Sequence, residues 1–83
     1  MLLAPNQTVH WFRVLTDLRM SGLSLDAIGK RIGGVPRERI SGWLNIGCQP
    51  RHDDGERLIV LWEDLMHLDR SDVPVVDRND WRL

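Results

Sequence analysis

Residues 22–46 read GLSLDAIGKRIGGVPRERISGWLNI, and this stretch contains the signals for two short helices joined by a glycine turn. Gly22 suits the left-handed position that ends a preceding helix. Ser24 can cap the next helix by accepting hydrogen bonds from the free amides of its first turn. Asp26 is favourable beside that positive helix end. We therefore predict that a helix begins directly after residue 24.

The first of these helices has one apolar face. Leu25, Ile28 and Ile32 recur at positions i, i+3 and i+7, which places them on one side of a helix and predicts that this side faces a core. Lys30 and Arg31 fall on the opposite side. Their charges are therefore expected in solvent.

A glycine turn separates the two helices. Gly33 and Gly34 end the first helix because glycine adopts positive φ without a Cβ clash. Pro36 suits the first turn of the next helix, where its missing N–H has no cost. In that second helix the predicted buried stripe consists of Ile40, Trp43 and Leu44, and the predicted outward face consists of Arg37, Glu38, Ser41 and Asn45.

Five positions of this stretch resemble the helix-turn-helix of the phage repressor and Cro superfamily. The family pattern has a small residue in the first helix, an apolar residue three later, a glycine, and two apolar anchors in the second helix. The matching residues here are Gly29, Ile32, Gly33, Ile40 and Trp43. A residue without a side chain is expected at the first of these positions because the two helices approach closely there. The resemblance covers roughly residues 8–68.

The turn departs from the family pattern. The family usually has glycine, one apolar residue and then the cap, whereas this chain has Gly33, Gly34, Val35 and Pro36, which is one residue longer. The longer turn bears on which residues of the second helix would face a ligand.

Helices are also expected on both sides of the pair. Thr8 can cap a helix that runs to about Ser21, and its apolar side would consist of Trp11, Val14, Leu15 and Leu18. Downstream, Asp53 and Glu56 have the spacing of a capping box, which predicts a fourth helix to about Leu68.

The fourth helix has more apolar residues than a narrow stripe requires. Its expected stripe consists of Leu58, Leu61, Trp62, Leu65 and Leu68. Ile59 and Met66 widen it. Two interpretations are open: the surplus is a surface for a partner, or the helix is central and is covered by the same chain.

Residues 69–83 differ in character from the rest. They are acidic, with a β-like run from Val73 to Val76, and Trp81 lies near the end. A disordered tail is the default for such a terminus, and the alternative is an arm that docks on a neighbouring subunit or adds an edge strand. The predicted fold class is all-α: a compact four-helix domain over residues 1–68, followed by a short tail over 69–83, extended or β.

Composition limits the class of protein. Its 83 residues make one domain. We expect no membrane span, because no run approaches about 18 apolar residues, and no signal peptide, because the N-terminus lacks a basic start and a long apolar stretch. The single cysteine, Cys48, cannot form an intramolecular disulfide and fits a reducing compartment. These features predict a cytoplasmic protein.

Charge is divided unevenly along the chain, although the formal net charge is only −1. Residues 1–52 hold seven basic and three acidic residues, a net charge of +4. Residues 53–83 hold four basic and nine acidic residues, a net charge of −5. The positive half contains the two-helix stretch. Such an asymmetry would orient the domain on a polyanion, although a small domain with both charges on its surface would also show it.

Catalytic and metal sites are not supported. Cys48 and His52 have a ligand-like spacing, but Pro50 lies between them and no further ligand completes a zinc set. No phosphate-binding loop or nucleophile motif is present. We therefore expect no enzyme activity, no cofactor and no small-molecule ligand. Helix capping accounts for the carboxylates Asp53, Asp54 and Glu56.

The resemblance implies a regulator that binds double-stranded DNA with its second helix in the major groove, as a homodimer reading an inverted repeat. A phage or prophage repressor, in a bacterial cell or an infected host, is the implied type. Arg37 is the first candidate for a guanine contact, because its planar fork matches O6 and N7. Glu38 can accept from a cytosine amine or can act only as an anion at the helix N-terminus. Ser41 and Asn45 complete the predicted base contacts.

Two further sets of residues follow from this interpretation. Phosphate contacts need only charge and reach, and the residues expected to make them are Arg13, Lys30, Arg31, Arg39 and Arg51. A dimer needs exposed apolar anchors, and the residues expected to supply them are Ile59, Met66, Val75, Val76 and Trp81.

Two other functions are compatible with the same features. One is a DNA-binding accessory module without regulatory action, such as a packaging or transposition factor. The other is a protein-interaction adaptor that uses the helix-turn-helix only as a scaffold. Salt-dependent binding to duplex DNA separates the adaptor from the other two.

Overall fold

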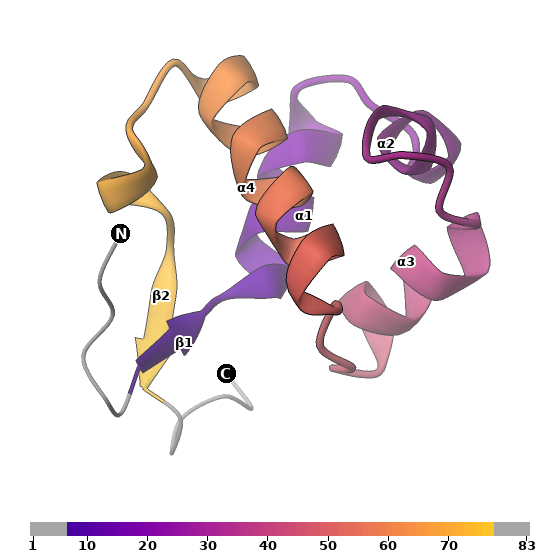
Figure 1. Cartoon of the computed structure of the whole chain (residues 1–83), viewed down its shortest axis with the longest axis horizontal. Helices are drawn as coiled ribbons and strands as arrows, with labels where there is room; N and C mark the ends of the chain where they lie inside the picture. Colours follow the sequence, from indigo (N-terminus) through magenta and orange to yellow (C-terminus); the bar gives the residue numbers. More distant parts are fainter. Residues whose placement is uncertain (1–6, 78–83) are drawn as a thin grey trace.

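Four α-helices and two short strands make up residues 7–77, the part of the chain that the computed structural model describes (Figure 1). Their bounds are β1 Gln7–Val9, α1 Trp11–Met20, α2 Leu25–Arg31, α3 Arg37–Asn45, α4 His52–Met66, the 3₁₀ turn η1 Arg70–Asp72, and β2 Val75–Asp77. The predicted class, a small helical domain with a short extended segment after it, is confirmed.

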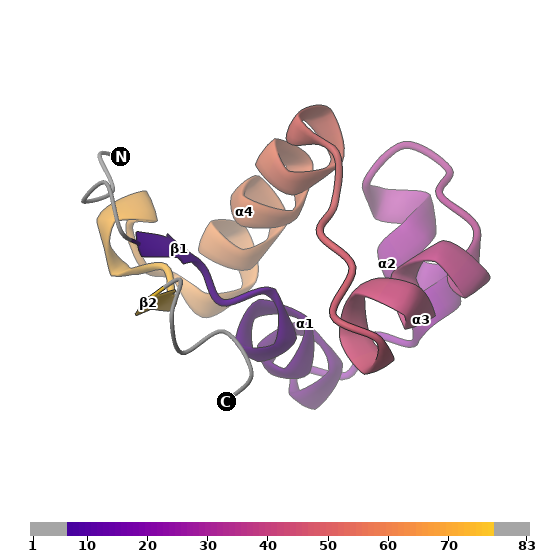
Figure 2. The ribbon, with the colours of Figure 1, turned by 90° about the horizontal axis from the view of Figure 1, so that it is seen from below.

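The core lies among the four helices. α1 packs against both α3 and α4, and α2 packs against α3, so α1 is central to the arrangement (Figure 2). The helix residues that form the core are Val14, Leu15, Leu18, Ile28, Ile40, Trp43, Leu58, Ile59, Leu61 and Trp62, with Ile32 at the end of α2. The apolar stripes predicted for α1, α2 and α3 supply most of this set.

Gly29 is the place where α2, the turn and α3 meet. Its carbonyl accepts hydrogen bonds from Gly34 N at 2.8 Å and Val35 N at 3.0 Å, which folds the turn back over α2. A Cβ at Gly29 would overlap the Val35 carbonyl oxygen and would lie 3.2 Å from Ile40 Cδ1. The close approach expected at this glycine is confirmed, and the turn backbone makes the closest contact.

The turn itself needs glycine at two successive positions. Gly33 has φ +104° and Gly34 has φ +92°, both in the region that L side chains rarely adopt. Pro36 follows in an extended conformation as the residue before the first helical residue of α3. The double glycine therefore provides the reversal that the longer turn requires.

The start of α1 differs from the prediction. Thr8 does not cap the helix, because it lies in β1, where it is paired with Val76 of β2. The helix begins at Trp11 and is capped by His10, whose Nδ1 accepts a hydrogen bond from Arg13 N at 3.3 Å. The backbone N–H of His10 donates to Pro74 O at 2.8 Å. Pairing with the C-terminal strand thus fixes residues 7–9 as extended.

The predicted capping box at the start of α4 is wrong. The helix begins at His52, and Asp54 is already a buried helical residue. Glu56 does not reach back to the helix start, because its carboxylate pairs with Arg70 of η1. A Cβ at Gly55 would lie 2.9 Å from Trp11 Cη2. Gly55 thus packs on α1 as part of the first turn of α4, and the helix begins before it, at His52.

The end of α4 also differs. The helix ends at Met66, and His67 adopts the left-handed conformation with φ 57°. Leu68 was predicted to continue the apolar stripe, but the chain has left the helix there and the residue is 48% exposed.

Residues 70–77 fold onto the helices, so the default of a disordered tail is wrong for them. η1 contacts α4, and β2 pairs antiparallel with β1. Val73 is only 4% exposed and belongs to the core. The expected extended segment is therefore a strand partner of the chain's own N-terminal residues. Trp81 lies outside the described residues.

The contact at Gly29 predicts a stability effect. Gly29→Ala should lower the free energy of unfolding by about 1–3 kcal/mol, because the new methyl group overlaps backbone that cannot change rotamer. Urea denaturation followed by circular dichroism measures this change.

Gly42→Ala is the matched control. It lies in α3 with no atom within 4 Å of an added Cβ and no positive φ. It should raise stability by about 0.5–1 kcal/mol, because alanine favours the helix. Equal effects of the two substitutions would contradict the proposed role of Gly29.

Candidate functional site

α3 has a buried side and a polar outward side. Ile40 and Trp43 are 0% and 4% exposed and fix the rotation of the helix against α1 and α2. The residues left on the outward side are Arg37, Glu38, Ser41 and Asn45, of which only Ser41 is partly covered. Asn45 Nδ2 donates to Ser41 Oγ at 2.9 Å. The predicted outward face of this helix is therefore present, and two of its members are already linked.

Arg37 lies at the start of α3 and reaches back to α2. Its Nη1 is 3.8 Å from Asp26 Oδ2, and the two side chains are 59% and 61% exposed. An ion pair this exposed contributes little to stability. The guanidinium can therefore leave Asp26 for a stronger bidentate acceptor at small cost.

Further exposed cations lie on both sides of the turn in the sequence and before α4. Lys30 and Arg31 are exposed at the end of α2, and Arg39 is exposed in the first turn of α3. Arg51 is exposed directly before α4. The short turn thus brings the cations of α2 and α3 close in the chain and in space, while Arg51 comes from a separate segment.

Arg57 joins this region, which the sequence did not indicate. A Cβ at Gly33 would lie 3.7 Å from Arg57 Nη1, so the guanidinium is next to the turn. It also lies 3.8 Å from Asp54 Oδ1. Arg57 lies in the acidic half of the sequence, and it reaches the turn only because of the way α4 packs. Its position could therefore not be predicted from the sequence.

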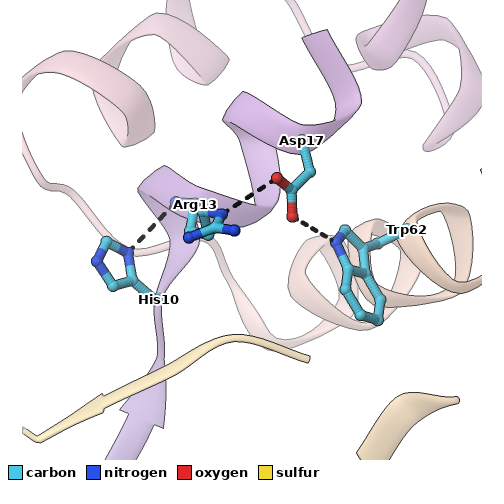
Figure 3. A network of polar contacts seen from close by, with 4 residues as sticks. All are labelled: His10, Arg13, Asp17 and Trp62. Carbon is cyan, nitrogen blue, oxygen red and sulfur yellow. Dashed lines mark hydrogen bonds and ion pairs between the residues drawn. The ribbon is translucent and has the colours of Figure 1, made fainter. Parts of the chain in front are cut away.

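Arg13 belongs to a polar network between α1 and α4 (Figure 3). Its Nε donates to Asp17 Oδ1 at 3.2 Å, and the other carboxylate oxygen, Oδ2, accepts from Trp62 Nε1 at 3.0 Å. Trp62 is 2% exposed, whereas the Arg13 side chain is 65% exposed. Asp17 therefore satisfies a buried indole N–H with one oxygen and orients an exposed guanidinium with the other.

The residues predicted for a dimer surface are not brought together. Ile59 is 3% exposed and packs in the chain's own core, so its assignment to an interface is wrong. α4 is covered by α1 on one side and by η1 and Val73 on another, which accounts for its wide apolar arc. Met66 is half-buried against the same core. Val75 is 38% exposed on β2, with Val76 half-buried beside it.

No metal-binding group is present among residues 7–77, where three or more potential His, Cys, Asp or Glu ligands never cluster. Cys48 is exposed. None of the helices in this range is long and apolar enough to cross a membrane.

Comparisons with protein-family models, curated proteins and solved structures give no match.

The Asp17 network predicts a difference between two substitutions. Asp17→Ala should lower the free energy of unfolding by about 1–3 kcal/mol, because the indole N–H of Trp62 stays buried without an acceptor. Asp17→Asn should cost less than about 1 kcal/mol, since its amide oxygen can still accept and only the exposed pair with Arg13 is lost. Urea denaturation followed by tryptophan fluorescence compares them, with Arg13→Ala as the control for the ion pair. Equal losses for the two Asp17 variants would show that the indole bond is not the source of stability.

Proposed function

We propose that this protein binds double-stranded DNA sequence-specifically, with α3 in the major groove, and represses transcription as a homodimer of the phage or prophage type. The observation that supports the proposal best is the outward face of α3. It is polar, exposed, and held by buried anchors on a helix pair that Gly29 keeps closely packed. A helix with such a face fits the width of the major groove.

The distribution of charge favours the same face. The segment from α2 to the end of α3, Leu25–Asn45, holds four basic and two acidic residues. The segment from α4 to the end of η1, His52–Asp72, holds two basic and seven acidic residues. A polyanion would be attracted to the first segment and repelled by the second. The domain would therefore approach DNA with α2 and α3 first.

The side chains take different roles in this proposal. Arg37 reads a guanine when it exchanges Asp26 for O6 and N7, and Glu38, Ser41 and Asn45 are the other base-contacting residues. The exposed cations proposed for phosphate contacts are Arg13, Lys30, Arg31, Arg39 and Arg51. Arg57, beside Gly33, is an additional candidate for this second role.

The proposed dimer uses the small sheet. Among the described residues β1 and β2 pair only with each other, and the proposed contact is between the outer edge of β2 and a second copy. Val75 is exposed there. A two-fold dimer would present two α3 helices to half-sites about one turn of DNA apart.

Salt dependence tests the electrostatic part of the proposal. With about five phosphate contacts per monomer, log affinity for duplex DNA should fall against log salt with a slope of ~0.9 per contact. Arg39→Ala should reduce the slope by about one contact. Arg19→Ala is the control, since Arg19 is exposed on α1 and has no proposed contact. Binding that stays flat with salt would contradict the proposed phosphate contacts, and no measurable binding to duplex DNA would favour the protein-interaction adaptor.

Selection from random duplex DNA tests specificity. The selected site should be an inverted repeat with half-site centres about 10 base pairs apart, or a multiple of that. On this site Arg37→Ala should cost about 1–3 kcal/mol and relax the preference at one base position. Arg39→Ala should weaken specific and random DNA evenly. If both variants lose affinity equally on the two kinds of DNA, the assignment of Arg37 to a base is wrong, and an asymmetric site would contradict the dimer.

A further inference from the structure

The outer side of α4 has an open groove that the DNA-binding proposal does not use. Its floor is apolar and includes Val60, Leu61 and Leu68. Val60 is 58% exposed and Leu68 is 48% exposed, and both line the groove. The groove therefore has apolar surface that no described part of the chain covers.

The groove follows one face of the helix. Glu56, Val60 and Asp64 are spaced at i, i+4 and i+8, so they lie along the same side of α4, and His67 lines the groove directly after the helix ends. This side is opposite the one that meets α1, where Leu58 and Trp62 are buried. The length of α4 thus provides a straight strip onto which an extended or helical segment can lie.

The charges along the groove are separated. Arg31 and Arg57 border the end near the turn. The other end has the carboxylates of Glu63 and Asp64 of α4, and none of the salt bridges within residues 7–77 involves either of them. Asp69 and Asp72 add two more carboxylates there, which also accept backbone hydrogen bonds in the capping box of η1. Glu56 also lines the groove and is already paired with Arg70. The uncompensated charge of the groove is therefore negative.

We infer that this groove is a docking surface for a basic amphipathic helix of another protein. Apolar side chains of that helix would cover Val60 and Leu68, and lysine or arginine residues on its flanks would pair first with the carboxylates of Glu63 and Asp64. The inference does not depend on the DNA-binding proposal.

The charges select this occupant over two others. Nucleic acid is disfavoured because the carboxylates repel phosphates. A second copy of this chain would have to place its own basic α2–α3 surface in the groove. That contact joins two different surfaces, and it continues from copy to copy unless it closes into a ring.

The test uses a fluorescent probe peptide of about fifteen residues, long enough to form a helix when bound, with leucines at i, i+3, i+4 and i+7 and lysines elsewhere. Fluorescence anisotropy with the full chain should show saturable binding. A peptide with the same residues in scrambled order should bind at least about tenfold more weakly, because its apolar stripe is lost. Equal affinities of the scrambled and ordered peptides would show that the interaction is only nonspecific charge attraction, and would overturn the inference.

Surface variants locate the binding. Val60→Ser and Asp64→Lys should each weaken the ordered peptide about tenfold while circular dichroism stays unchanged, since both side chains are exposed. Asp53→Lys and Ile46→Ser are the controls, an exposed carboxylate and an exposed aliphatic residue outside the groove, and should leave affinity unchanged. Loss of affinity in the controls as large as in the groove variants would overturn the assignment.

Two other measurements separate this inference from the alternatives. Val60→Ser should leave the affinity for duplex DNA unchanged. Failure of the groove proposal can therefore be distinguished from failure of the DNA-binding proposal. Sedimentation of the chain without peptide tests the second copy. Self-association that Val60→Ser abolishes would replace the foreign helix with another copy of this chain and overturn the inference.

Discussion

The close contact between Gly29 and the backbone of Val35 is the constraint on which the arrangement of α2 and α3 depends. The Gly29 carbonyl accepts from Gly34 N and Val35 N, and no side chain separates the two segments. The turn therefore lies directly against α2, which sets the angle at which α3 leaves it. Because Ile40 and Trp43 then fill the core, the remaining side of α3 has to face outward. The orientation of the outward face of α3 therefore depends on the absence of a side chain at Gly29.

The rest of the domain holds this pair in place. α1 contacts both α3 and α4, and the bond from Trp62 to Asp17 adds a polar link to the apolar packing of α1 on α4. The strand pair β1–β2 and Val73 join the two ends of the described chain to the same core. In a domain of this size each such link is a substantial part of a small total stability. The candidate interface is thus supported by contacts far from it in sequence.

Two surfaces of opposite character result. The α2–α3 side has exposed cations near a polar helix face, and the outer side of α4 has carboxylates near exposed apolar side chains. Arg31 and Arg57 mark the boundary, since both border the groove and Arg57 lies beside the turn. The proposed nucleic acid and the proposed basic helix have opposite charges and would bind mainly to different residues.

The sequence alone determined what depends on neighbours in the chain. Ser24, the glycine pair and the apolar spacing of α2 and α3 defined those helices, and hence the outward face with Arg37 and Asn45. Tertiary structure decided the rest. Thr8 is in a strand because its partner is Val76, Glu56 pairs with Arg70 and forms no cap, and Ile59 is buried because α4 is covered on two sides. Local rules describe backbone amides and helix faces, whereas these outcomes depend on which distant segment supplies the partner, and only the folded packing fixes that.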